Sequence, residues 1–336
     1  MKKLSATIKQ AAGRVRIAAI CSLLAAFLLP ALPAGAQVNS LSDQYLVNLF
    51  LLNPAVAGTG QFGSLTVASR QQWAGWSGAP ASQSITYHTK FARANDRFNP
   101  LGFINKGKNS YSKVGAGAGF FHESYGVFNL TGMHLDYSYH VFLTKGRLSF
   151  GLGPTLYHIG TSSVTMTDPG DPWLDNPVRS NFFDANAGAH YFSKTWYGGV
   201  SLVQLLNGVV RFGNYGYPGT ESPSLNPDLA RSVYAYGGYY FTVNRSLNLK
   251  VEPMALIKLN AVDGFRFDIS GTVHLRDLLS GGLSYAYKRG VSAFLGARLD
   301  NLSFRYIFEI PFTGDIPARY SSHLIQLSIN IGQPLD

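Results

Sequence analysis

The side chains in this sequence that could perform acid–base chemistry are histidines and carboxylates on the polar faces of strands. His134, Asp136, His140, Asp268 and His274 all stand in runs where polar and apolar residues alternate. A Ser–His–acid arrangement would use these types, but geometry and not composition identifies it, and no Gly-x-Ser-x-Gly turn is present. Paired interior charges, such as Arg305 with Glu309, explain them more simply. The sequence therefore predicts a protein that is not an enzyme and has no catalytic residues.

Metal and cofactor chemistry has equally little support in the sequence. Asp168, Asp171 and Asp175 lie in the loop "DPGDPWLDNP", whose spacing differs from that of a calcium loop. Cys21, the only cysteine, lies near the N-terminus, so a thiolate metal site or a disulfide framework is not expected. We predict no metal and no cofactor. The chain has no basic stripe or nucleic-acid motif, and we expect no nucleic-acid partner.

Residues 1–36 have the pattern of a secretory signal. Five basic residues and no acid precede an apolar run from Ile17 to Pro33, and "AGA" supplies small residues before Gln37. We predict cleavage there; a retained signal anchor is the alternative. Cleavage removes five of the 28 Lys and Arg residues, so the formal charge of +10 overstates that of the mature chain, which suits solubility or an anionic surface.

The elements that must position these polar residues are long alternating strands. In "NLSFRYIFEI", residues 301–310, the apolar side chains share one face and Ser303, Arg305 and Glu309 share the other. The segments 246–259 and 264–276 alternate in the same way. A period of two indicates strands with one apolar and one polar face. These runs exceed the five or six residues usual in soluble strands and match the roughly nine to eleven needed to cross a bilayer.

Only a closed barrel pairs every backbone group of a strand in lipid. The sequence therefore predicts an all-β fold, a transmembrane antiparallel β-barrel of about 14 strands over residues 62–336. A secreted β-sandwich is the alternative. The expected strands are 62–71, 82–91, 112–121, 127–143, 147–160, 182–193, 196–206, 232–243, 246–259, 264–276, 279–288, 291–299, 301–311 and 320–332.

The connections between these strands predict how the barrel is oriented. "TKG", "SKT" and "NRS" are short turns, whereas 161–181 and 207–231 are long polar loops. Short turns are periplasmic and long loops external in outer-membrane barrels, so we expect both termini in the periplasm. The linker 92–111 is long for a periplasmic turn, and it contains a further strand or folds into the lumen. Tyrosine and tryptophan near strand ends suit the two membrane interfaces; the candidates are Tyr111, Trp196, Tyr197, Tyr234, Tyr236, Tyr239, Tyr240 and Tyr320.

An apolar segment, too short to span a membrane, precedes the first strand. Residues 37–61 include "DQYLVNLFLLNPAVAG", in which Leu46, Leu49 and Phe50 suit one or two helical turns that end at Asn53-Pro54. We predict that this segment plugs the lumen; a periplasmic tail is the alternative. Glycines inside strands, as in "VGAGAGF" and "FGLGP", would make room on the lumenal face for such a plug.

Three short motifs give the chain a family resemblance. They are the Asn-Pro-Ala-x-Ala-Gly stretch, the Arg-Gln-Gln-Trp at the end of the first strand, and the Gly-Ala-Pro-x-x-Gln that enters the second. Together they resemble the N-terminal signature of the PorP/SprF family of type IX secretion outer-membrane proteins. The matching positions are Asn53, Pro54, Ala55, Gly58, Arg70, Gln71, Gln72, Trp73, Gly78, Pro80 and Gln83.

The resemblance implies a non-catalytic outer-membrane barrel from a Bacteroidetes-type bacterium. The family assists the export or surface attachment of large proteins, including gliding adhesins. The implied partners are the C-terminal region of a secreted surface protein, other type IX components and outer-membrane lipid. We expect partner contacts at Trp76, Trp173, Tyr215 and Tyr217 in the outer loops. The alternative is a FadL-like outer-membrane transporter of hydrophobic small molecules.

Overall fold

The computed structural model describes residues 41–60, 62–90, 113–126, 128–161, 179–206, 210–212, 231–260, 264–312 and 320–331. Residues 37–336 form one compact unit. The predicted signal at 1–36 and the linker 92–111 lie outside the described residues. Among the helices of the described part, none has the length and hydropathy required to span a membrane.

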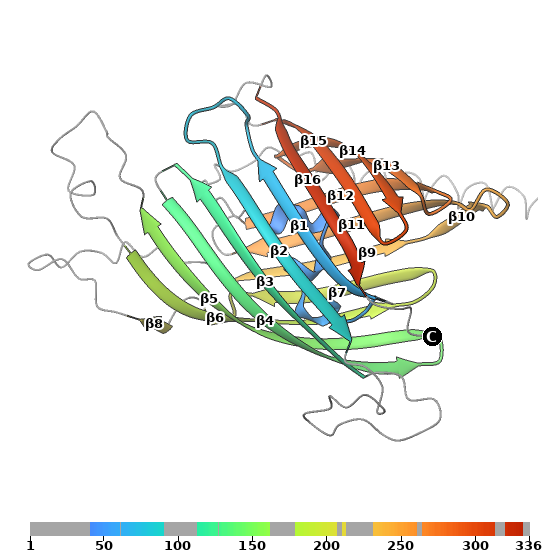
Figure 1. Ribbon diagram of the computed structural model, residues 1–336, viewed down its shortest axis with the longest axis horizontal. Coiled ribbons are helices and arrows are strands. Elements are labelled where there is room, and N and C mark those ends of the chain that lie inside the picture. Colours follow the sequence, from blue (N-terminus) through green and yellow to red (C-terminus); the bar gives the residue numbers. More distant parts are fainter. Residues whose placement is uncertain are drawn as a thin grey trace, which may run out of the picture. The chain divides into compact units, whose positions relative to one another are not determined.

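Antiparallel strands make up almost all of the regular structure in the described residues (Figure 1). Short 3-10 turns precede them at Leu41–Leu46 (η1), Leu49–Leu51 (η2) and Pro54–Val56 (η3). The strands are β1 Gly63–Gln71, β2 Ala81–Lys90, β3 Val114–Tyr125, β4 Phe128–Leu143, β5 Gly146–Thr161, β6 Arg179–Phe192, β7 Trp196–Val203, β8 Val210–Phe212, β9 Ser232–Tyr239, β10 Phe241–Asn244, β11 Leu249–Asn260, β12 Gly264–Leu275, β13 Leu279–Ala286, β14 Gly290–Leu299, β15 Leu302–Pro311 and β16 Ser322–Ile331.

The strands form a closed ring, which removes every sheet edge that would face lipid. β1 pairs with β16 over nine residue pairs, and β7 pairs with β9 on the far side of the ring. β9 and β10 both pair with β11, so together they occupy one strand position in the wall. β8 pairs with β6 beyond the end of β7, so β7 and β8 also share one position. The described residues therefore form a closed antiparallel barrel of fourteen wall strands, as the sequence predicts.

Side chains alternate between the outside and the lumen, and the strand register aligns them into rows. One outward row crosses six strands with exposed fractions between 41% and 48%; its members are Leu327, Val67, Ile85, Phe120, Met133 and Leu156. The neighbouring inward positions are polar, and the Thr66 and Ser328 hydroxyls lie 2.8 Å apart. An apolar outside around a polar lumen is the pattern of a barrel surrounded by lipid.

The tyrosine cluster in β9 differs from the expectation of an interfacial belt. Trp196 and Tyr239 face outwards, with 44% and 41% of their surface exposed. Tyr234 and Tyr236 are 1% and 6% exposed and pack inside the barrel. Because the period of two sends alternate residues of one strand to opposite faces, a run of tyrosines near a strand end divides between the membrane interface and the lumen.

Candidate functional site

Residues 41–58, called the lumenal segment here, lie inside the ring of strands (Figure 1). Asn48 caps η2 by accepting from the Phe50 amide at 3.1 Å, and Asn53 caps η3 by accepting from the Ala55 amide at 2.9 Å. The prediction that the helical turns end at Asn53-Pro54 is confirmed, because η2 ends at Leu51 and Asn53 has an extended backbone. The same pair also starts η3, which was not predicted from the sequence: an N-cap asparagine followed by proline at the first helical position favours a new turn.

Asn53 attaches the lumenal segment to the wall. Its side chain is fully buried, and its amide nitrogen donates to the carbonyl oxygens of Ala189 and Val200 at 3.1 and 3.2 Å. The same nitrogen lies 3.1 Å from the hydroxyl of Tyr236, which in turn lies 3.0 Å from Nδ1 of His190. One side chain thus joins η3 to β6, β7 and β9, which are distant from it in sequence.

Glycines in the wall make room for this close approach. A methyl group at Gly115 or Gly151 would overlap the backbone of Ala57 or Ala55, respectively. At Gly188 it would overlap the Asn53 side chain. The expectation that strand glycines accommodate a lumenal segment is confirmed at these positions, since any larger residue there would displace the segment.

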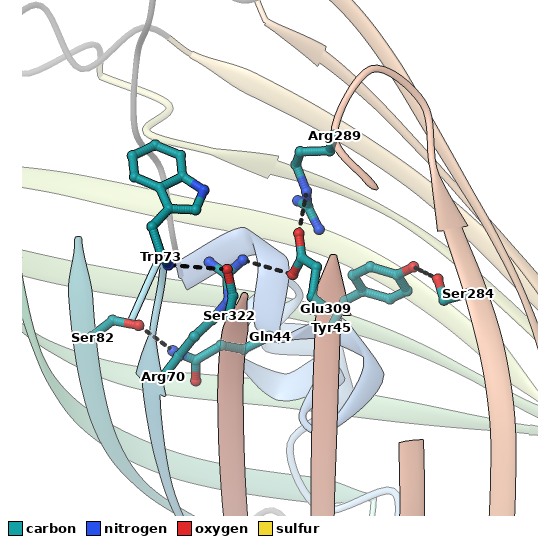
Figure 2. Close-up of polar contacts among 9 residues, drawn as sticks. All are labelled: Gln44, Tyr45, Arg70, Trp73, Ser82, Ser284, Arg289, Glu309 and Ser322. Carbon is teal, nitrogen blue, oxygen red and sulfur yellow. Dashed lines mark hydrogen bonds and ion pairs between the residues drawn. The ribbon is translucent and has the colours of Figure 1, made fainter. Parts of the chain in front are cut away.

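The other end of the lumenal segment is bound to the opposite part of the wall. Figure 2 shows Gln44 at Ser82 and Tyr45 at Ser284. The Gln44 amide donates to Ser82 Oγ at 3.0 Å and accepts from Ser84 at the same distance. Tyr45 Oη lies 3.3 Å from Ser284 Oγ on β13, and the Arg305 guanidinium donates to the Leu46 carbonyl. The segment therefore crosses the lumen and is anchored on both sides.

A buried ion pair lies beside the lumenal segment near the end of β1 (Figure 2). Arg70 Nη2 is 2.9 Å from Glu309 Oε2, and the two side chains are 3% and 11% exposed. Arg289 Nε lies 3.6 Å from the same carboxylate, and the Gln72 amide oxygen, directed at Arg70, accepts from its Nη2 at 2.8 Å. The prediction that Glu309 pairs with Arg305 is wrong, because Arg70 lies across the ring closure, where sequence alternation gives no indication of partners.

The remaining motif residues shape the connection between β1 and β2. Trp73 has a φ of 43°, and its amide donates to Ser322 Oγ at 3.3 Å, which turns the chain towards β16 (Figure 2). Gln72 N donates to the Pro80 carbonyl at 2.9 Å, and the Gly78 carbonyl accepts from Gly126 N at 3.0 Å. Gln71 and Gln83 face outwards and are exposed.

Trp76 presents an exposed aromatic ring at this end of the barrel. It is 43% exposed, and its ring meets Tyr320 edge-on at a centroid distance of 5.1 Å. This end, called the loop end here, has the connections that follow β1, β5, β8 and β15; the opposite end, called the turn end, has the short connections at 144–145, 193–195 and 245–248. The other expected partner-binding residues, Trp173, Tyr215 and Tyr217, lie outside the described residues.

The histidines that carry the potential for acid–base chemistry are bound into interior polar pairs. His134 Nδ1 lies 2.5 Å from Asp136 Oδ2, and His274 Nε2 lies 2.7 Å from Glu252 Oε2. His140 Nδ1 is 2.6 Å from Ser149 Oγ, while Ser138 Oγ donates to the Ala57 carbonyl of the lumenal segment at 2.7 Å.

His134 and a further histidine, His88, contact the lumenal segment through ring packing. Phe50 packs against His88 and His134 at centroid distances of 4.9 and 5.4 Å. Asp268 is also buried. In the described part of the chain, no three His, Cys, Asp or Glu side chains gather as a metal site would require.

A polar cavity remains on the turn-end side of the lumenal segment. Its volume is about 720 Å³, and its lining includes Glu252, His274, Arg298 and Arg305. Tyr197 Oη donates to Glu252 at 2.6 Å within this wall. The lumenal segment thus lies between this cavity and the loop end.

The sequence matches the family described as type IX secretion system membrane protein PorP/SprF over residues 34–329. The chain belongs to the PorP/SprF family. The resemblance inferred from the three N-terminal motifs is therefore confirmed, and with the barrel it identifies an outer-membrane protein of type IX secretion. No curated protein matches the sequence.

Solved barrels resemble this PorP/SprF protein in structure at very low sequence identity. Omp33 of Acinetobacter baumannii is 6% identical, with a TM-score of 0.43 over 81% of this chain and 100% of that one. The KdgM porin is 8% identical, with a TM-score of 0.37 over 80% of this chain and 99% of that one. The translocator domain of the autotransporter NalP from Neisseria meningitidis is 11% identical, with a TM-score of 0.35 over 88% and 92%.

Within this PorP/SprF chain, the three signature motifs form the lumenal segment, the wall beside it and the adjoining loop. The Asn-Pro-Ala motif anchors the lumenal segment, Arg70 and Gln72 brace the wall beside it, and Trp73 to Pro80 form the adjoining loop. Sequence reasoning missed Tyr236 and Arg305 as residues that hold the segment. The only available signal was their position on polar faces of strands, which gives no partner.

Proposed function

We propose that this protein is a non-catalytic barrel that assists the export or cell-surface attachment of large secreted proteins such as adhesins. It binds the C-terminal region of the client at the loop end, together with other type IX components. Membership of the PorP/SprF family carries this proposal. The FadL-like transporter is the competing function.

The lumenal segment is the plug of this barrel in the proposal. Two observations support a plug: its anchors lie on opposite parts of the wall, and Asn53, Phe50 and Leu52 are at most 3% exposed. A transporter needs a plug that moves to open a path, whereas a binding protein works with one that stays fixed. The dense hydrogen bonding of Asn53 favours the fixed plug and therefore the binding protein.

The loop end is the client-binding face, with both termini in the periplasm. Short turns are periplasmic in outer-membrane barrels, and those of this chain carry exposed cations at Lys145, Lys194, Arg245 and Arg276, which suit the anionic headgroups of a membrane surface. At the loop end the Trp76–Tyr320 pair is exposed. Aromatic side chains dominate the energetics of many protein interfaces.

A pull-down from the native outer membrane tests the proposal. The full chain, tagged at its C-terminus, is extracted in mild detergent, and co-purifying proteins are identified by mass spectrometry. A large surface protein retained through its C-terminal region, and lost in Trp76→Ala, supports client binding. Trp196→Ala, which changes an equally exposed tryptophan at the turn end, is the matched control. A barrel recovered without a large partner would overturn the proposal.

A further inference from the structure

The outer wall has an apolar groove that the function above does not use. It crosses β9 and β11 to β15 and has a volume of about 1010 Å³. Its lining follows two adjacent outward rows of the strand register. One row starts at Gly237 on β9 and reaches Ile310 on β15; the other starts at Tyr239 and reaches Phe308.

Small residues on the lipid-facing side create this groove. Gly237, Ala255, Gly271 and Ala293 occupy outward positions where other rows carry leucine, valine or phenylalanine. A methyl group added at Gly271 would meet no atom within 4 Å. Next to it Leu283 stands out from the wall with 69% of its surface exposed. In the strand register Gly271 and Ala293 flank Leu283, so two low positions lie on either side of this raised side chain.

The dimensions of the groove fit a lipid acyl chain. Neighbouring strands are about 4.8 Å apart, so six strands give a groove of roughly 24 Å, which suits an inclined chain in a leaflet about 15 Å deep. A protein interface typically needs about 20–30 residues a side, whereas about a dozen outward side chains line this groove. A single hydrocarbon chain fills the groove, whereas the groove has too few residues for an interface with a folded protein.

A cation lies on the loop-end side of the groove. Tyr285 and Val291 line the groove on this side and flank the turn that carries Lys288. Lys288 is three residues along the chain from both Tyr285 and Val291, so its Cα lies at most about 11 Å from theirs, and the Lys288 ammonium is within reach of the groove. Lys288 is exposed, and its ammonium lies 5.4 Å from the ring centre of Tyr287, which stacks on Phe267.

We propose that this groove is a binding site for lipid A: an acyl chain lies across Gly271 and Ala293, and a phosphate contacts Lys288. Charge complementarity at Lys288 selects an anionic headgroup. The choice of lipid A rests on the orientation proposed above, because the loop end then lies in the outer leaflet. The opposite orientation would place a glycerophospholipid there.

Lipid analysis of purified protein tests the site. The full chain and its variants are extracted from native outer membrane in mild detergent, and bound lipid is quantified by mass spectrometry through the β-hydroxylated acyl chains that mark lipid A. Gly271→Leu fills the floor of the groove. Ala118→Leu is the matched control, since Ala118 faces outwards on the other side of the barrel between Tyr87 and Leu135.

The expected result is lipid A on the wild type and on Ala118→Leu, with at least a tenfold loss in Gly271→Leu. Lys288→Gln should lower retention about fivefold, the effect of one cation near a lipid phosphate. Equal retention by all variants would overturn the site. Groove-dependent retention of glycerophospholipid in place of lipid A would also overturn the proposal. The client pull-down does not depend on this groove, so it separates failure of the lipid site from failure of the proposed function.

Discussion

Asn53→Ala should loosen the lumenal segment without opening the barrel. The substitution removes four hydrogen-bonding contacts of the side chain: those to Ala189, Val200 and Tyr236, and the cap on the Ala55 amide. A typical buried hydrogen bond contributes about 0.5–1.5 kcal/mol, and buried groups left unpaired add to the loss. Because two N–H groups serve three acceptors, we expect the segment to lose about 2–4 kcal/mol of local stability.

Hydrogen–deuterium exchange of the amides in residues 49–58 measures this change directly. At about 1.4 kcal/mol per tenfold, the local opening equilibrium should rise roughly 30- to 700-fold. Exchange in β1 and β16 should stay unchanged, because their ladder does not involve Asn53. Gln83→Ala is the control, since it alters a motif residue that faces outwards. Unchanged exchange of the segment in a folded Asn53→Ala barrel would refute the role of Asn53 as its anchor.

Three further predictions follow from the wall and the loop end. Arg70→Ala or Glu309→Ala alone should destabilise the barrel by about 3–5 kcal/mol because each removes the nearest partner of a buried charge; the double variant should lose less than the sum, and urea unfolding checks this. Gly151→Leu should expel the lumenal segment and expose it to protease, whereas Gly271→Ala, on the outer face, should leave the digestion pattern of the wild type. Trp76→Ala should weaken client capture by about 2 kcal/mol or more, as for an interface hot spot, in a titration against the client's C-terminal region, with barrel stability unaltered.

Most of the barrel could be predicted from the alternation of polar and apolar residues, because side chains that face lipid must be apolar. Expected strands such as 301–311 and 264–276 agree with β15 and β12 to within a residue at each end. Two features of the wall were not predicted: β8 lies at Val210–Phe212, inside the expected loop 207–231, and the expected strand 232–243 is divided into β9 and β10. A strand of three residues is too short to show alternation, and the side-chain pattern of 232–243 does not show where the backbone leaves the ladder.

The candidate site was harder to predict because its contacts are distant in sequence. The motifs containing Asn53 and Arg70 could be recognised, but their partners Tyr236 and Glu309 lie 183 and 239 residues away. Alternation assigns such residues to a face and not to a neighbour. The pairing of Glu309 with Arg70 instead of Arg305 shows this limit, since only the ring closure between β1 and β16 brings the two together.

The ring closure also has a consequence for how this protein is made. The second ladder of β1 forms only with β16, the last strand of the described residues, and the Leu46 carbonyl is bound only once Arg305 is in place. Contacts this far apart in sequence make folding slow. The lumenal segment and β1 therefore lack these contacts until β15 and β16 are in place. Closure of the ring and attachment of the lumenal segment at Leu46 thus both depend on late strands, so a chain truncated before β16 would lose the ladder that closes the barrel.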